Sequence, residues 1–70
     1  MNDLLHQAEQ MMNDGKLHEA LDLYNQKILD SPDDALAYQG AALTLYKLKN
    51  MEKAIEMSRK ALSLDSHLAF

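Results

Sequence analysis

Cysteine and tryptophan are absent from the 70 residues, and the chain has one proline, two glycines and one phenylalanine. Without cysteine the chain cannot form disulfides, and it lacks the thiolate that structural zinc sites prefer. A chain of this length buries only about 60% of the surface that its unfolded form exposes. We therefore expect a thin core, supplemented by self-association or by a larger parent protein.

Long apolar runs and an excess of basic residues are also missing. No stretch reaches the roughly 18 apolar residues of a membrane span, and the first residues (Met1, Asn2, Asp3) lack the basic start of a signal peptide. The absence of cysteine fits a reducing compartment, so we expect a cytoplasmic protein without membrane insertion. Eleven acidic residues oppose seven basic ones, giving a net charge of -4, which disfavours phosphate backbones and hence nucleic-acid partners.

The charges are divided unevenly along the chain. Residues 1–35 hold eight acids and two bases (-6), whereas residues 36–70 hold three acids and five bases (+2). Two interpretations stay open, a solvated polar face on each helix or head-to-tail attraction between chains.

Strands are not expected, because the chain has three Ile or Thr residues, no Val, and no useful run in which apolar and polar residues alternate. Apolar residues instead recur with helical spacing, as in the set Leu4, Leu5, Ala8, Met11 and Met12. The periodicity predicts an all-α fold with helices at residues 3–13, 17–29, 34–48 and 51–64.

Short breaks separate these predicted helices. Gly15 follows Asn13 and Asp14, all of which tolerate the left-handed end of a helix, and Lys49-Asn50 makes the last turn. Pro32 disfavours helical geometry at Ser31 and so ends the second helix. We expect Asp33 to cap the third helix and Asp34 to lie at the positive end of its dipole.

An internal repeat appears when the chain is shifted against itself by 34 residues. Small residues then meet small ones and large apolar residues meet large ones. The superposed pairs are Ala8/Ala42, Ala20/Ala54, Ala35/Ala69, Leu17/Met51, Leu21/Ile55 and Ile28/Leu62. Small residues suit positions where two helices approach closely, and larger ones fill the grooves between ridges.

The order of residue types resembles the tetratricopeptide repeat family over essentially the whole chain. The first repeat supplies Leu4, Ala8, Met11, Gly15, Leu17, Ala20, Tyr24 and Pro32. The second supplies Tyr38, Ala41, Ala42, Leu45, Asn50, Met51, Ala54, Ser58 and Ala61, with Ser66 in the proline position. Two positions depart from the family pattern: Lys27 stands where a small residue is usual, and Ser58 replaces an aromatic residue.

The resemblance implies two antiparallel helix-turn-helix hairpins stacked as a short right-handed solenoid. The whole chain, residues 1–70, is then a single domain. Residues 1–34 form repeat one, residues 35–68 form repeat two, and residues 66–70 form a tail or the start of a third repeat.

Catalytic and metal-binding chemistry is not expected. The three histidines, His6, His18 and His67, are not placed by spacing beside a nucleophile and an orienting carboxylate. His6 and Glu9 lie one turn apart, but a metal site in a helical bundle needs several inward-facing donors. We expect no enzyme activity, no metal and no cofactor.

A binding surface is implied by the resemblance, since the first helices of successive repeats line a concave face. The positions concerned are Asn2, Leu5, His6, Glu9, Met12, Asn13, Leu36, Gln39, Gly40, Leu43, Tyr46 and Lys47. Five are sizeable apolar residues, which favours an apolar peptide or helix as partner. Leu5 and Glu9 stand where clamping a terminal carboxylate would need a cation and an amide, so that ligand is disfavoured. Gly40 either leaves room for a partner or is merely tolerated in the helix.

Self-association is the second functional hypothesis. Stacked repeats usually need about three units, and this sequence contains two. We expect Ile55 and Leu62 to be exposed and, with Leu68 and Phe70, to contact a second copy in a homodimer or further chain in a larger scaffold or chaperone.

Overall fold

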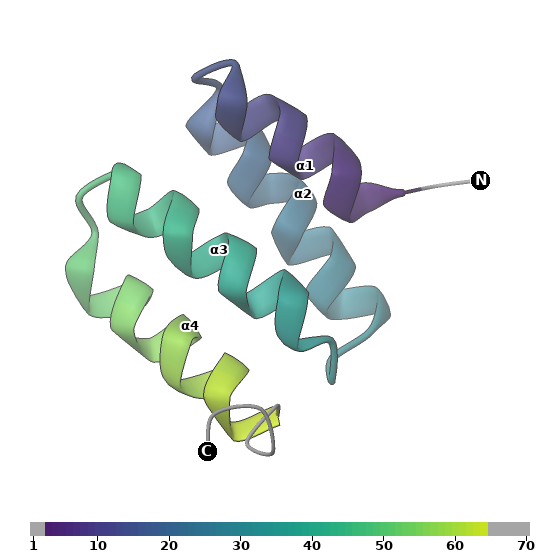
Figure 1. Ribbon diagram of the computed structural model, residues 1–70, viewed down its shortest axis with the longest axis vertical. Coiled ribbons are helices and arrows are strands. Elements are labelled where there is room, and N and C mark those ends of the chain that lie inside the picture. The colour runs from purple at the N-terminus through teal and green to yellow at the C-terminus, as the bar shows by residue number, and fades with distance from the viewer. Residues whose placement is uncertain (1–2, 65–70) are drawn as a thin grey trace.

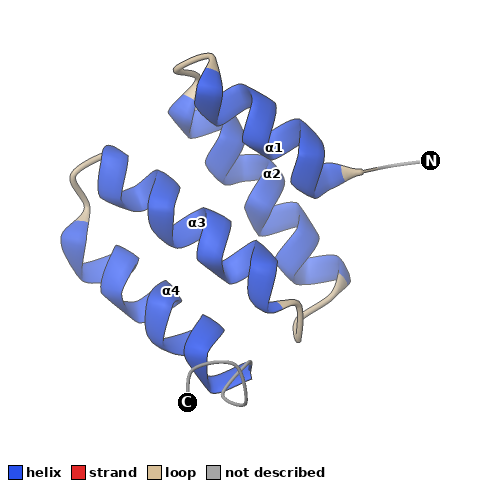
Figure 2. Ribbon diagram, viewed as in Figure 1, coloured by secondary structure: helices blue, strands red, loops and turns tan. Residues whose placement is uncertain are grey.

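The computed structural model describes residues 3–64, which contain four α-helices and no strand (Figure 2). The helices are α1 (Leu4–Asn13), α2 (Leu17–Asp30), α3 (Ala35–Lys47) and α4 (Met51–Leu64). Each boundary lies within one residue of the prediction, so the all-α class and the four helices are confirmed. No helix in the described part of the chain is long and apolar enough to cross a membrane.

Local polar contacts and two left-handed residues set the helix ends. The Asp3 carboxylate accepts a hydrogen bond from the backbone N–H of His6 (3.1 Å) and caps α1. Gly15 ends the first turn at φ 82°, a conformation that costs glycine little. Lys49 adopts φ 68° in the last turn, and the Asn50 side chain accepts from the N–H of Lys53 at the start of α4 (3.4 Å).

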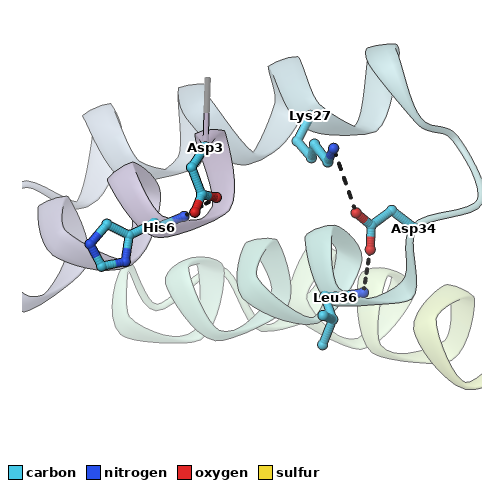
Figure 3. A network of polar contacts seen from close by, with 5 residues as sticks. All are labelled: Asp3, His6, Lys27, Asp34 and Leu36. Carbon is cyan, nitrogen blue, oxygen red and sulfur yellow. Dashed lines mark hydrogen bonds and ion pairs between the residues drawn. The ribbon is translucent and has the colours of Figure 1, made fainter. Parts of the chain in front are cut away.

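The cap of α3 lies one residue later than predicted. The N–H of Asp34 donates to the Ser31 carbonyl oxygen (3.0 Å), so Pro32 and Asp33 are both used in a turn. Asp34, and not Asp33, then caps the helix by accepting from the N–H of Leu36 (3.0 Å; Figure 3). The prediction of Asp33 was wrong because the chain needs two residues after Ser31 to reverse direction.

The helices form two antiparallel pairs, with α3 between the α1–α2 pair and α4 (Figure 1). Helix α3 contacts the other three described helices, whereas α4 packs against α3 alone. The Lys60 ammonium lies 6.0 Å from the centre of the Tyr38 ring, which adds a cation–π contact between α3 and α4. Helix α3 is therefore the centre of the fold.

The core consists mainly of alanine. Seven of the ten buried apolar residues are Ala8, Ala20, Ala37, Ala41, Ala42, Ala54 and Ala61. Small side chains let the helix backbones approach closely, as the small residues of the 34-residue repeat predicted. The three larger residues of this buried set are Tyr24, Tyr38 and Leu45.

Thr44 is the largest fully buried side chain. Its hydroxyl donates to the Gly40 carbonyl oxygen at 2.8 Å and lies 3.4 Å from the Met12 sulfur of α1. Its polar atom is thus satisfied within the helix, as burial requires, and its side chain also contacts α1 at Met12.

Candidate functional site

An apolar groove of about 850 Å³ crosses the molecule and takes side chains from all four helices. Its lining residues are Leu5, Glu9, Met12, Tyr24, Leu36, Gln39, Gly40, Ala42, Leu43, Tyr46, Met51, Ala54, Ile55, Ser58, Arg59 and Leu62. Glu9 and Arg59 are the charged members of this set, so the groove wall is chiefly hydrocarbon, amide and hydroxyl.

The structure brings most of the predicted concave residues together. Eight of the twelve predicted positions line the groove, namely Leu5, Glu9, Met12, Leu36, Gln39, Gly40, Leu43 and Tyr46. Lys47 is exposed at the last turn of α3 and is not a lining residue. His6 and Asn13 are exposed and also lie outside the lining, and Asn2 lies outside the described residues.

The two surfaces that the sequence suggested are one surface in the structure. Ile55 and Leu62 are exposed as predicted, at 53% and 58%. They line the same groove as Leu36 and Leu43. A partner segment and a second copy of the chain would therefore compete for one site. The predicted contacts of Leu68 and Phe70 fall outside the described residues.

Six further lining residues were missed by sequence reasoning: Tyr24 of α2, Ala42 of α3, and Met51, Ala54, Ser58 and Arg59 of α4. The 34-residue repeat could have predicted that α4 contributes to this surface. Ile55 and Leu62 correspond to Leu21 and Ile28, which pack onto the core cluster of the first hairpin. Ser58 and Met51 lie on the same stripe as Ile55 and Leu62, three or four residues apart, and so face the same way.

One interpretation of Gly40 was that it leaves room for a partner. In the structure the missing side chain leaves no open space. A Cβ atom at Gly40 would overlap the ring of Tyr24, so that ring already occupies the place of the missing side chain. Gly40 is a contact point between α2 and α3. Tyr24 is buried, at 3% exposure, as a member of the core cluster.

Burial raises the pKa of the Tyr24 hydroxyl above its ordinary value, and the negative charge of Glu9 raises it further. Tyr24 is therefore neutral at physiological pH. The groove floor then carries a neutral ring beside a carboxylate.

A polar contact outside the groove joins α2 to the start of α3. The Lys27 ammonium lies 4.0 Å from the Asp34 carboxylate, and the side chains are 26% and 22% exposed (Figure 3). The lysine that departs from the family pattern thus turns toward the N-terminus of α3. Its partner is the same carboxylate that caps α3, so one side chain links the two hairpins.

The groove lining is mainly apolar, a composition suited to covering apolar surface. Among residues 3–64, no three His, Cys, Asp or Glu side chains gather as a metal site would require. Arg59 of α4 is the one cation of the lining, and Glu9 of α1 is its one acid. No protein-family model, curated protein or solved structure matches the chain.

Proposed function

We propose that this chain is a protein-interaction module that binds an apolar peptide or helix in the groove. One observation carries the proposal. Seven large apolar side chains are exposed in the described residues, and six of them line the groove: Leu36, Leu43, Tyr46, Met51, Ile55 and Leu62. Leu29 is the exception. Exposed apolar surface gathered in one place marks an interaction site, whereas scattered apolar residues do not.

The composition of the groove favours a segment that presents an apolar stripe. Aliphatic side chains recur along α3 and α4, which suits an amphipathic helix lying between them. Met12 and Met51 are flexible and polarisable, so they can repack around side chains of different shape. Catalysis and a cofactor form no part of this proposal.

We also propose that the chain is a two-repeat member of the tetratricopeptide type, stacked as a right-handed solenoid. The 34-residue register supports it, because Ala8 and Ala42 are both buried, as are Ala20 and Ala54. The contact of α3 with both α1 and α2 also supports it, since stacked hairpins place each new helix against the preceding pair.

The test uses a library of amphipathic helical peptides displayed against the chain, followed by fluorescence anisotropy on a selected labelled peptide. Leu43→Glu puts a charge in the groove and should weaken binding at least tenfold, because a buried unpaired carboxylate is costly. Leu29→Glu is the matched control. It changes the exposed large side chain that lies outside the groove, so binding should not change. Equal effects of the two substitutions would show that the groove is not the site.

Self-association is a second candidate, and the position of Ile55 and Leu62 favours it. These side chains of α4 are exposed beside the same groove, so a second copy has an apolar surface to cover. We propose that copies of the chain occupy the groove weakly and that a fitting partner displaces them.

A further inference from the structure

The first hairpin already binds a helix, because α3 lies on it. Gly40 of α3 meets the ring of Tyr24 on α2, and the Thr44 hydroxyl lies 3.4 Å from the Met12 sulfur on α1. Leu21 and Ile28 of α2 pack against the core cluster that includes Ala41 of α3. These contacts define how a helix sits on an α1–α2 surface in this protein.

The groove contains the equivalent surface of the second hairpin. A shift of 34 residues relates the α1 and α2 residues that support α3 to residues of the groove. The pairs are Met12/Tyr46, Leu21/Ile55, Tyr24/Ser58 and Ile28/Leu62. All four second members line the groove. Ile55 and Leu62 are exposed, whereas Leu21 and Ile28 are partly buried against the core. The second hairpin thus offers a helix seat that no described helix covers.

The two seats differ in size at one position. On the first hairpin, the large Tyr24 ring fills the space left by a glycine on the seated helix. On the second, the corresponding residue is Ser58, which is small and exposed. A helix that packed on the second hairpin as α3 packs on the first would therefore have unfilled space beside Ser58. At the corresponding place, Gly40 of α3 contacts the Tyr24 ring.

We propose that the groove takes an amphipathic helix of a partner protein, seated as α3 is seated on the first hairpin, with a large apolar side chain where α3 has Gly40. The preferred residues at that position are Leu, Met and Phe, because they fill the space beside Ser58. This inference rests on the proposed function and adds a size rule to it.

Charge and symmetry favour a partner helix over a second copy. Arg59 is the cation among the lining residues, so an acidic side chain on the flank of the partner helix that meets α4 is favoured. A symmetric pair of copies places the same patch on both sides of the interface. In such a pair two grooves would face each other, and neither copy would present a separate helix to fill the seat beside Ser58.

The test varies the size of residue 40 in a bound peptide and the size of residue 58 in the chain. The probe is a fluorescein-labelled peptide of residues 34–48, made with Gly or with Leu at position 40 and measured by anisotropy against the full chain. The wild-type chain should bind the Leu peptide about tenfold more tightly than the Gly peptide. Ser58→Tyr restores the first hairpin's arrangement and should reverse the preference. Ser63→Tyr, an exposed position of α4 outside the groove, should keep the wild-type preference.

Each outcome decides the inference. Equal affinity of the two peptides for the wild-type chain, or no binding of the Leu peptide, overturns it without reference to any variant. An unchanged preference in Ser58→Tyr also overturns it, and Ser58→Leu serves if the tyrosine variant does not fold. If peptides bind and Leu43→Glu weakens them but no size preference exists, the proposed function stands and the size rule fails. If no groove substitution affects binding of any peptide, the proposed function itself fails.

Discussion

At the residue scale, Gly40 has a steric role that its place in a helix does not reveal. In an open helix, alanine at this position would raise the free energy of unfolding by about 1 kcal/mol, because glycine is the poorer helix former. In this protein a Cβ atom would overlap the Tyr24 ring. The sign of the Gly40→Ala effect therefore distinguishes a packing role from mere tolerance.

We expect Gly40→Ala to lower the free energy of unfolding by about 1 to 3 kcal/mol, the usual cost of overpacking. Urea denaturation followed by circular dichroism measures it. In a Tyr24→Leu background the same substitution should cost less, because the ring it meets has been removed. A stabilised Gly40→Ala protein would contradict the close contact.

Tyr24 also makes stability depend on alkaline pH. Its pKa is raised in the folded chain, first by burial and then by Glu9. The unfolded chain loses the phenol proton near its ordinary pKa of about 10, whereas the folded chain holds it to higher pH. The stability that the neutral Tyr24 contributes is fully present below the pKa that Tyr24 has in the unfolded chain. It is lost as the pH rises through the higher pKa of the folded chain.

We therefore expect the free energy of unfolding to fall above pH about 10, and to fall less in Tyr24→Phe. Urea denaturation at neutral pH and at pH about 11 compares the two proteins. At neutral pH the variant should lie within about 0.5 kcal/mol of the wild type, because the ring is kept. If both proteins lost the same free energy of unfolding at alkaline pH, Tyr24 would not be the cause of the loss.

At the element scale, Asp34 holds the start of α3 and links α3 to α2. Its carboxylate caps α3 by accepting a hydrogen bond from the Leu36 N–H, and the same carboxylate lies 4.0 Å from the Lys27 ammonium. Asp34→Ala removes both contacts and should lower the free energy of unfolding by about 1 kcal/mol. Asp34→Asn keeps an oxygen for the cap and should cost only a few tenths, since partly exposed ion pairs contribute little.

Thermal and urea unfolding of both variants measure these differences. Asp33→Ala is the control, because Asp33 lies in the turn and does not cap the helix. Its effect should stay within about 0.5 kcal/mol. If Asp33→Ala costs more than Asp34→Ala, the assignment of the cap to Asp34 is wrong.

The extent of each helix could be predicted from sequence, whereas the cap of α3 could not. Apolar spacing and the breaks at Gly15, Pro32 and Asn50 act locally, so they fix helix ends within a residue. The choice between Asp33 and Asp34 depends on how many residues the turn after Ser31 consumes. That number follows from the turn that the Asp34 N–H and the Ser31 carbonyl oxygen close, which helical periodicity does not encode.

At the scale of the whole molecule, the groove was foreseen in part. Residues of α1 and α3 were predicted to share a face, and eight of the twelve predicted positions do line the groove. The contribution of α4 was expected on a separate surface. Joining the two surfaces requires the inclination of α4 on α3, which no single motif in the sequence encodes.

One measurement tests whether copies occupy the groove. We expect the mass of the wild-type chain, followed by light scattering after size-exclusion chromatography, to rise with concentration into the high micromolar range. The Ile55→Glu/Leu62→Glu variant should remain a monomer, because two charges would enter the apolar interface. Its stability should change little, since both side chains are more than half exposed.

Leu29→Glu provides the control for that comparison. Leu29 is 83% exposed and lies outside the groove lining, so its variant should follow the wild-type mass at every concentration. A wild-type chain that stays monomeric throughout would contradict weak self-association. It would leave the partner-helix proposal unaffected.

Among the described helices, α4 has α3 as its single neighbour. A segment seated in the groove would give α4 a second neighbour, so occupancy and folding are thermodynamically linked. A ligand that binds the folded chain alone stabilises it in proportion to the logarithm of its free concentration over its dissociation constant. The melting temperature of the unlabelled protein thus becomes a reporter of occupancy, and candidate partners can be ranked by how far they raise it.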